Sequence, residues 1–159
     1  MALVFRPVET EADLALLDHA LRRLSVDLGD THGAGLDALR VGLMGDVPAA
    51  YGLLMLDEGL LGAALYGPVF STVRGAAGVY VSDLWVDQTV RGRGLGRAVL
   101  AEVARRAGGL WRAEWMTLAV YAHSTGPRRF YERLGFEAQN ATTMRLAGAM
   151  MQRLKGENG

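Results

Sequence analysis

The segment that most constrains this chain is a loop of alternating glycine and arginine, Val-Arg-Gly-Arg-Gly-Leu-Gly-Arg-Ala-Val-Leu, at residues 90–100. An apolar strand pattern precedes the loop and an amphipathic helix pattern follows it. The glycines lack the Cβ atoms that would keep a ligand away from the backbone, and the N–H groups at a helix start attract negative charge. We therefore predict that this loop binds a phosphorylated ligand.

Three arginines alternate with these glycines: Arg91, Arg93 and Arg97. Guanidinium groups pair with phosphate oxygens, so they add to the anion-binding capacity of the backbone. A glycine-rich turn with solvated arginines would explain the glycines, but it would not explain three arginines at a helix start. The sequence favours the anion site.

Two common phosphate-binding motifs do not fit this loop. A P-loop needs a lysine followed by serine or threonine, and the sole lysine of the chain is Lys155, near the carboxyl end. The dinucleotide motif G-x-G-x-x-G would need a third glycine where Arg97 stands. The sequence thus excludes a P-loop and disfavours a Rossmann fold.

Length and composition predict one domain over residues 1–159. Half of the 159 residues are apolar, which is enough for one core. The net formal charge is zero, so we expect neither nucleic acid nor membrane as a partner. Cysteine is absent, which excludes disulfides and thiolate nucleophiles, and the three histidines lack metal-ligand spacing, so we expect no metal. The first residues lack the features of a signal peptide, and we expect a cytoplasmic protein.

Apolar patterns predict both strands and helices. The strand patterns lie at residues 3–6, 50–56, 60–66, 79–86, 114–121 and within 137–146. The helix patterns lie at residues 11–28, 36–44, 96–107, 127–134 and 147–154. Thr10 and Asp13 predict a capping box, Gly59 can take a positive φ in a hairpin turn, and Pro127 is expected as a first helical residue.

This order of elements resembles the GNAT N-acetyltransferase superfamily over nearly the whole chain. In that superfamily the pyrophosphate of acetyl-CoA lies on a loop of the form Arg/Gln-x-x-Gly-x-Gly/Ala, which Arg91, Gly94 and Gly96 match. The resemblance implies an α+β fold in three layers, with a mixed, mostly antiparallel sheet of six to seven strands flanked by helices. It also implies acetyl-CoA as the co-substrate.

A second motif of the superfamily is a helix with Asn or Ser seven residues before a tyrosine, ending in Gly-Phe. Ser124, Tyr131, Gly135 and Phe136 match it. Together, the two motifs and the strand before the loop imply a set of donor-binding residues. These are Leu84, Trp85, Val86, Arg91, Gly92, Arg93, Gly94, Leu95, Gly96, Arg97, Ser124 and Tyr131.

Within the superfamily, residues 70–86 look most like the diamine and polyamine (spermidine/spermine-type) acetyltransferases and their bacterial relatives. Those enzymes usually carry Glu-Asp where this chain has Ser82-Asp83, and the glutamate is expected to meet the substrate amine. The resemblance implies a small-molecule primary amine as acceptor, diamine, polyamine or amino-acid-like, with Ser82 at a substrate-binding position. It also implies a homodimer, which the apolar segment at 147–154 would suit, although a buried terminal helix in a monomer would show the same pattern.

Acetyl transfer from a thioester to an amine needs no covalent enzyme intermediate, which suits a chain without cysteine. By resemblance, backbone N–H groups at residues 84–86 face the acetyl carbonyl. Tyr131 is the candidate catalytic acid, because a phenol with a pKa of about 10 can protonate the leaving thiolate. Taken alone Tyr131 could be a core aromatic, but the motif spacing favours the acid. Ser124 could equally be a helix cap.

The general base is left open by the sequence. Ser82 can at most hold a water that relays the proton. Strand alternation sends Asp83 to the face opposite Ser82, where we expect a structural ion pair or hydrogen bond. His123 has a suitable ordinary pKa of about 6.5, but a lone histidine at a strand end is more often exposed or capping.

The first hypothesis is therefore an acetyl-CoA-dependent N-acetyltransferase acting by direct transfer on a small amine. An alternative is a non-catalytic sensor module, in which the same loop holds CoA or an acyl-CoA. A third hypothesis is acetylation of protein amino termini or lysines. Turnover with free amines, with peptides or with neither separates the three.

Overall fold

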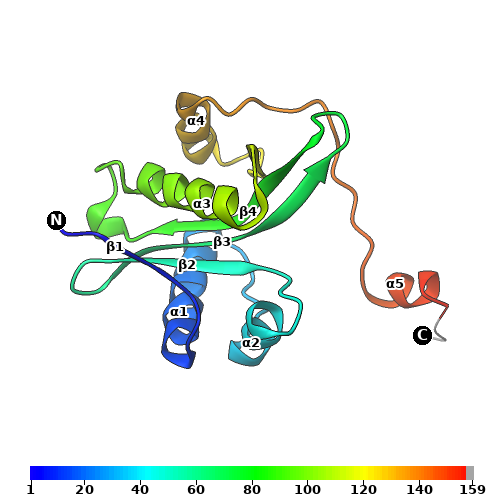
Figure 1. The fold of residues 1–159 in the computed structure, drawn as a ribbon, viewed down its shortest axis with the longest axis horizontal. Helices are drawn as coiled ribbons and strands as arrows, with labels where there is room; N and C mark the ends of the chain where they lie inside the picture. The colour runs from blue at the N-terminus through cyan, green and yellow to red at the C-terminus, as the bar shows by residue number, and fades with distance from the viewer. Residues whose placement is uncertain (157–159) are drawn as a thin grey trace. The chain divides into compact units, whose positions relative to one another are not determined.

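The computed structural model describes residues 1–156 and divides into two compact units, which are described separately. The first unit, residues 1–121, contains the sheet and three helices (Figure 1). The second unit begins at Ala122 and contains α4 (Thr125–Leu134) and α5 (Gly148–Leu154). That residues 1–159 form one domain therefore stays a prediction.

The sheet has five strands in the order β1-β2-β3-β4-β5. Neighbours from β1 to β4 are antiparallel, and β5 is parallel to β4. The predicted α+β class with a mixed, mostly antiparallel sheet is confirmed, but the number of strands is lower than the six to seven expected. The bounds are β1 Val4–Pro7, β2 Tyr51–Leu56, β3 Leu60–Ser71, β4 Ala76–Val86 and β5 Trp115–Leu118.

The strand predicted within residues 137–146 is wrong, because this segment is irregular. Every residue from Glu137 to Ala147 is exposed. The run Gln139-Asn140-Ala141-Thr142-Thr143 is largely polar and buries no apolar face. Asparagine is a poor strand former, and a segment that buries so little has nothing to offset the entropy of ordering it.

Helix α1 (Glu11–Leu28) begins and ends where its local sequence predicts. The Thr10 hydroxyl accepts from the Asp13 backbone N–H at 3.1 Å, and the Asp13 carboxylate accepts from the Thr10 N–H at 3.1 Å. Gly29 closes the helix in the left-handed conformation, with φ of 71°. The predicted capping box and glycine stop are therefore confirmed.

Helices cover both faces of the sheet in the first unit. Helices α1 and α2 (Leu36–Met44) lie on one face and α3 (Leu95–Trp111) lies on the other (Figure 1). On the α1 side the core includes Leu14, Leu17 and Trp85, of which the leucines are fully buried. Burial of one such leucine stabilises the fold by about 2 kcal/mol, so this face holds the sheet to the helices. The three-layer prediction is confirmed for this unit.

Two local predictions are wrong. In the β2–β3 turn the positive φ falls on Glu58, at 57°, and not on Gly59. Helix α4 begins at Thr125, so Pro127 is its third residue. A proline fits there because the first N–H groups of a helix have no partner within it. Among the helices of residues 1–156, none has the length and apolarity needed to cross a bilayer.

Candidate functional site

The glycine-arginine loop connects the end of β4 to the start of α3 by way of a short 3-10 turn, Gln88–Val90. Gly92 and Gly94 have φ of 81° and 75°. These left-handed conformations are open to glycine and strained for most other residues. The alternating glycines therefore set the path of the loop as well as removing side chains from it.

The start of α3 carries free backbone donors. Gly94 is the capping residue and offers no side-chain cap, and the N–H of Ala98 is bonded to the Gly94 carbonyl at 3.2 Å. The N–H groups of Leu95, Gly96 and Arg97 come before this first helical bond, so they have no acceptor within the helix. Such donors and the helix dipole favour a negatively charged ligand, and binding of a phosphorylated ligand at this loop stays a prediction.

Side chains around these donors divide into one anchor and two exposed cations. The Leu95 side chain is buried and fixes the first turn of α3 to the core. Arg93 and Arg97 are exposed. They are therefore accessible to a phosphate group in solvent.

Arg91 ties the loop to its surroundings. Its Nε donates to the Val86 carbonyl at 2.9 Å, and its guanidinium forms an ion pair with Asp27 of α1. Arg91 and Asp27 are 64 positions apart in the chain, so no local sequence pattern indicated this pair. Arg91 thus holds the loop against the end of β4 and against α1, a positioning role that the motif did not predict.

The sheet opens beside this loop. Strand β5 pairs with β4 only from Gly78 to Val81, while β4 continues to Val86. No strand of the described chain pairs with residues 82–86 on this side of β4. Unpaired strand groups can receive an extended ligand by main-chain hydrogen bonds. The predicted donor-binding residues 84–86 therefore lie on an open strand edge, next to the loop.

A β-bulge interrupts β4 at Ser82. Leu65 of β3 is paired with Asp83 and the next residue, Tyr66, is paired with Val81, which leaves Ser82 as the extra residue. The Ser82 hydroxyl lies 2.8 Å from Asp83 Oδ2 and 3.2 Å from the Leu65 carbonyl, so it can donate to either oxygen. The prediction that Asp83 lies on the face opposite Ser82 is wrong, because a bulge breaks strand alternation.

The Asp83 side chain is half-buried. Its pKa is raised, mainly because burial disfavours the charged carboxylate. The charge of Asp30 raises this pKa further, while the Ser82 hydrogen bond and His32 lower it. The Tyr121 hydroxyl lies 2.9 and 2.8 Å from the two Asp30 oxygens, so it can donate to either of them. Sequence reasoning missed Asp30 and Tyr121, since they are 91 positions apart and meet only in the folded chain.

Tyr131 and Ser124, the predicted residues of the second motif, belong to the second unit. The Tyr131 ring lies edge-on to Phe130 and Phe136, with centroids 5.1 and 5.5 Å away. Burial raises the pKa of the Tyr131 phenol. Ser124 is the N-cap residue of α4, and its carbonyl accepts from the Arg128 N–H at 3.1 Å, but its side chain makes no capping bond. Gly135 ends α4 with φ of 104°, as predicted.

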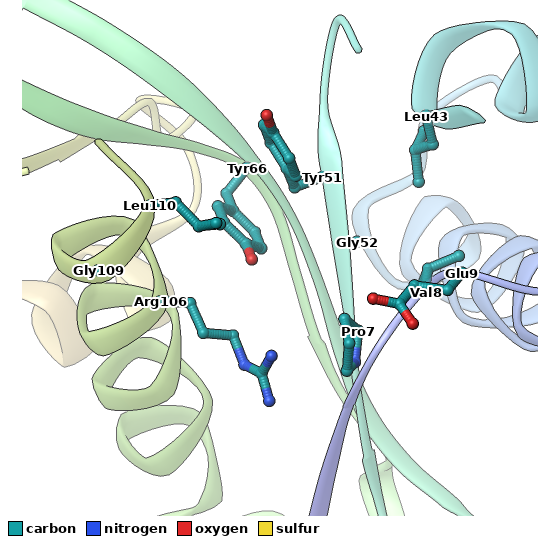
Figure 2. A pocket seen from close by; sticks show the side chains of 10 residues that line it. All are labelled: Pro7, Val8, Glu9, Leu43, Tyr51, Gly52, Tyr66, Arg106, Gly109 and Leu110. Atoms are coloured by element: carbon teal, nitrogen blue, oxygen red, sulfur yellow. The ribbon is translucent and has the colours of Figure 1, made fainter. Parts of the chain in front are cut away.

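A separate pocket of about 440 Å³ lies in the first unit, between β1, β2, β3 and the second half of α3. Figure 2 shows the Arg106 and Glu9 side chains on opposite walls of it, with the Tyr51 and Tyr66 rings above them in this view. Arg106 is eleven residues beyond Leu95, which places this pocket about 16 Å along α3 from the glycine-arginine loop. The pocket and the loop are therefore different places on the molecule. Within residues 1–156, no three side chains of a metal-ligating kind gather at one point.

The architecture and the loop agree with one known family. The model of the acetyltransferase (GNAT) domain matches residues 51–138, more than half of the chain, and this stretch contains β2 to α4 and both motifs. The chain therefore belongs to the GNAT family of acetyltransferases.

Curated relatives and several solved structures are similar to the chain. Spermine/spermidine N(1)-acetyltransferase of Bacillus subtilis (strain 168) is 24% identical over 86 residues, which are 53% of this chain and 57% of the relative. The chain thus matches little more than half the length of that relative.

Several solved structures share the fold of this chain. An integron cassette protein from the mobile metagenome of V. cholerae has a TM-score of 0.74 at 19% identity, with 98% of each chain covered. Ribosomal-protein-alanine N-acetyltransferase from Brucella melitensis biovar Abortus 2308 has a TM-score of 0.72 at 20% identity, covering 91% of this chain and 100% of that one. An aminoglycoside acetyltransferase from an uncultured soil metagenomic sample, in complex with sisomicin, has a TM-score of 0.72 at 14% identity. The match covers 92% of this chain and 95% of that one.

Proposed function

We propose that this protein is an acetyl-CoA-dependent N-acetyltransferase that moves an acetyl group directly to a primary amine of a small molecule. The proposal rests on two structural features that lie next to each other. The start of α3 offers backbone N–H groups without helical acceptors, and the adjacent end of β4 is an unpaired strand edge. A ligand with a diphosphate at one end and an extended, amide-containing arm fits both.

The donor is held by main chain in this proposal. The N–H groups of Leu95, Gly96 and Arg97 bind the diphosphate, and the exposed Arg93 and Arg97 side chains add charge. The edge of β4 at residues 84–86 pairs with the pantetheine arm and directs N–H groups to the acetyl carbonyl. These groups stabilise the oxyanion that forms when the amine attacks.

The reaction then needs a proton for the leaving thiolate. Tyr131 supplies it, since burial raises the pKa of this phenol and keeps it protonated at neutral pH. The carbon–nitrogen bond forms as the carbon–sulfur bond breaks, and the products are the acetylated amine and the CoA thiol. No enzyme nucleophile takes part, in agreement with a chain that has no cysteine.

A small amine is the acceptor that the available relatives support. The Bacillus subtilis relative carries spermine and spermidine in its name, and one structural neighbour was solved with sisomicin. The neighbour named for ribosomal-protein alanine shares the fold at 20% identity. We further propose that the protein acts in the cytoplasm as a homodimer, in which the exposed Met150, Met151 and Leu154 of α5 are covered.

Two measurements test the proposed reaction. Calorimetry with acetyl-CoA should give a heat of binding, and a thiol-release assay should show turnover with at least one amine from a panel of polyamines, amino acids and aminoglycosides. Binding without turnover on this panel or on peptides would indicate a sensor instead. Turnover with peptides alone would indicate a protein acetyltransferase. Absence of both heat and turnover would overturn the proposal.

Gly94→Ala tests the role of the loop conformation. A residue other than glycine costs about 1–2 kcal/mol at a φ of 75°, so the loop should shift and the affinity for CoA should fall about tenfold. Gly42→Ala is the matched control, because Gly42 lies within α2, where an added Cβ meets nothing within 4 Å. Calorimetry with CoA measures both variants. Equal affinities of Gly94→Ala and the parent would show that this conformation is not needed for binding.

A further inference from the structure

The bulge at Ser82 changes the face of the sheet on which the next residues of β4 lie. Val81 is paired with Tyr66, whose ring lies against Trp111 of α3 at 6.2 Å between centroids. Asp83 is paired with Leu65, which packs on the core that α1 covers. Without the bulge, residues 81 and 83 would share one face. The bulge therefore turns Asp83 to the face of α1, directly before residues 84–86.

A group of polar side chains meets Asp83 on this face. Ser82 lies 2.8 Å from it on β4, and Asp30 and His32 act on it from the loop that follows α1. The Tyr121 hydroxyl can donate to either oxygen of Asp30, and His32 Nε2 lies 3.4 Å from Asp18 Oδ1 of α1. The charge of Asp30 thus reaches the Asp83 carboxyl, and a positive group or a proton bound here would relieve the repulsion between the two carboxylates.

Resting on the proposed function, we propose that Asp83 accepts the proton of the acceptor ammonium and that Asp30 helps to bind that ammonium. Neither residue was predicted to be catalytic from the sequence. Ser82, which stands where the related enzymes usually carry glutamate, does not act as the base here. It orients Asp83 instead, through the hydrogen bond between their side chains.

The proposed transfer conserves protons and electrons. The acceptor arrives as an ammonium ion and gives one proton to the Asp83 carboxylate, which becomes a neutral acid. The freed nitrogen lone pair attacks the thioester carbon, and the carbon–sulfur bond breaks with its electron pair on sulfur. Tyr131 protonates the sulfur, and the second proton lost from nitrogen restores the Tyr131 phenol. Asp83 then releases its proton to solvent, so no oxidant or further reactant is needed.

The raised pKa of Asp83 suits this role and fixes the expected pH dependence. A base must be ionised, so kcat/KM of the parent enzyme should rise with pH through the raised pKa of Asp83. The contribution of Asp83 to the free energy of unfolding should instead fall as pH rises. A carboxyl whose pKa is raised by folding stabilises the protein at pH values below its unfolded pKa, and this contribution is lost as pH rises through the folded pKa.

Asp83→Asn is the deciding variant. We expect kcat to fall about a hundredfold, the rising limb of the pH profile to disappear, and the heat of acetyl-CoA binding to stay unchanged. The melting temperature at pH 8 should equal or exceed that of the parent, because the variant has lost a half-buried charge. Asp46→Asn, at an exposed position after α2, is the matched control and should leave all four measurements unchanged.

Two further variants separate the roles of the neighbours. Asp30→Asn should raise KM for the amine more than it lowers kcat, since Asp30 binds the ammonium without taking its proton. Ser82→Ala should lower kcat less than Asp83→Asn does. The rising limb of its pH profile should remain, because Asp83 is still present.

An Asp83→Asn enzyme with the kcat and pH limb of the parent would overturn this inference. Donor binding and turnover by the parent would leave the proposed function standing in that case. Loss of donor binding and of turnover in the parent itself would overturn both.

Discussion

Replacing Tyr131 with phenylalanine is expected to lower kcat about a hundredfold while the affinity for acetyl-CoA stays within about twofold of the parent value. The change removes only the phenolic O–H, and a positioned general acid typically contributes 10²–10⁴-fold to a rate. The ring contacts with Phe130 and Phe136 remain, so α4 should keep its structure. Loss of rate without loss of binding is the signature of a group that acts on the leaving thiolate.

Steady-state thiol release and calorimetry measure the two quantities for Tyr131→Phe. The matched control is Tyr51→Phe, which removes a hydroxyl but keeps a ring that lies against Tyr66 and Trp111 in the first unit. The control should have the kcat of the parent. If the Tyr131 variant turns over at the rate of the parent, Tyr131 has no role in proton transfer and the leaving thiolate takes its proton elsewhere.

Gly78→Val is expected to lower the free energy of unfolding by about 3 kcal/mol, the upper end of the usual cost of overpacking. Gly78 of β4 is paired with Trp115 of β5, and a Cβ added at Gly78 would lie 2.4 Å from two atoms of the Trp115 ring. The ring cannot move freely, because its Nε1 donates to the Ala76 carbonyl at 3.1 Å. The substitution should therefore separate β5 from β4.

Urea unfolding followed by tryptophan fluorescence measures this loss of stability directly. Gly59→Val in the β2–β3 turn is the control, since an added Cβ there meets nothing within 4 Å. It should change the free energy of unfolding by much less than Gly78→Val does. Equal stability of the Gly78 variant and the parent would mean that β5 can leave the Trp115 contact without cost.

Several features of the fold were predictable because the residues that form them are close in sequence. The capping box of α1 joins Thr10 to Asp13, and Gly29 ends the same helix. Gly94 sets the turn into α3, at the position that the loop motif indicated. In each case one side chain, or the lack of one, satisfies or frees backbone groups within four residues.

Other predictions failed because a pattern of residue types does not report pairing. The polar residues at 137–146 follow a helix and precede another, as a connecting strand would, yet the segment is irregular and exposed. The β-bulge at Ser82 arises from the register between β3 and β4, so an alternation rule applied to β4 alone assigned Asp83 to the wrong face. Strand register depends on both partners and on what each face buries.

The sequence by itself determined the donor half of the proposed site: a loop whose positive φ angles need glycine, followed by a helix start with free N–H groups. Only the tertiary structure decided the acceptor half. Asp30, Tyr121 and Asp83 lie far apart in the chain and come together because α1 packs on the sheet and a bulge rotates β4. Local conformation follows from the few residues that share a turn, whereas contacts across the fold follow from which surfaces bury one another.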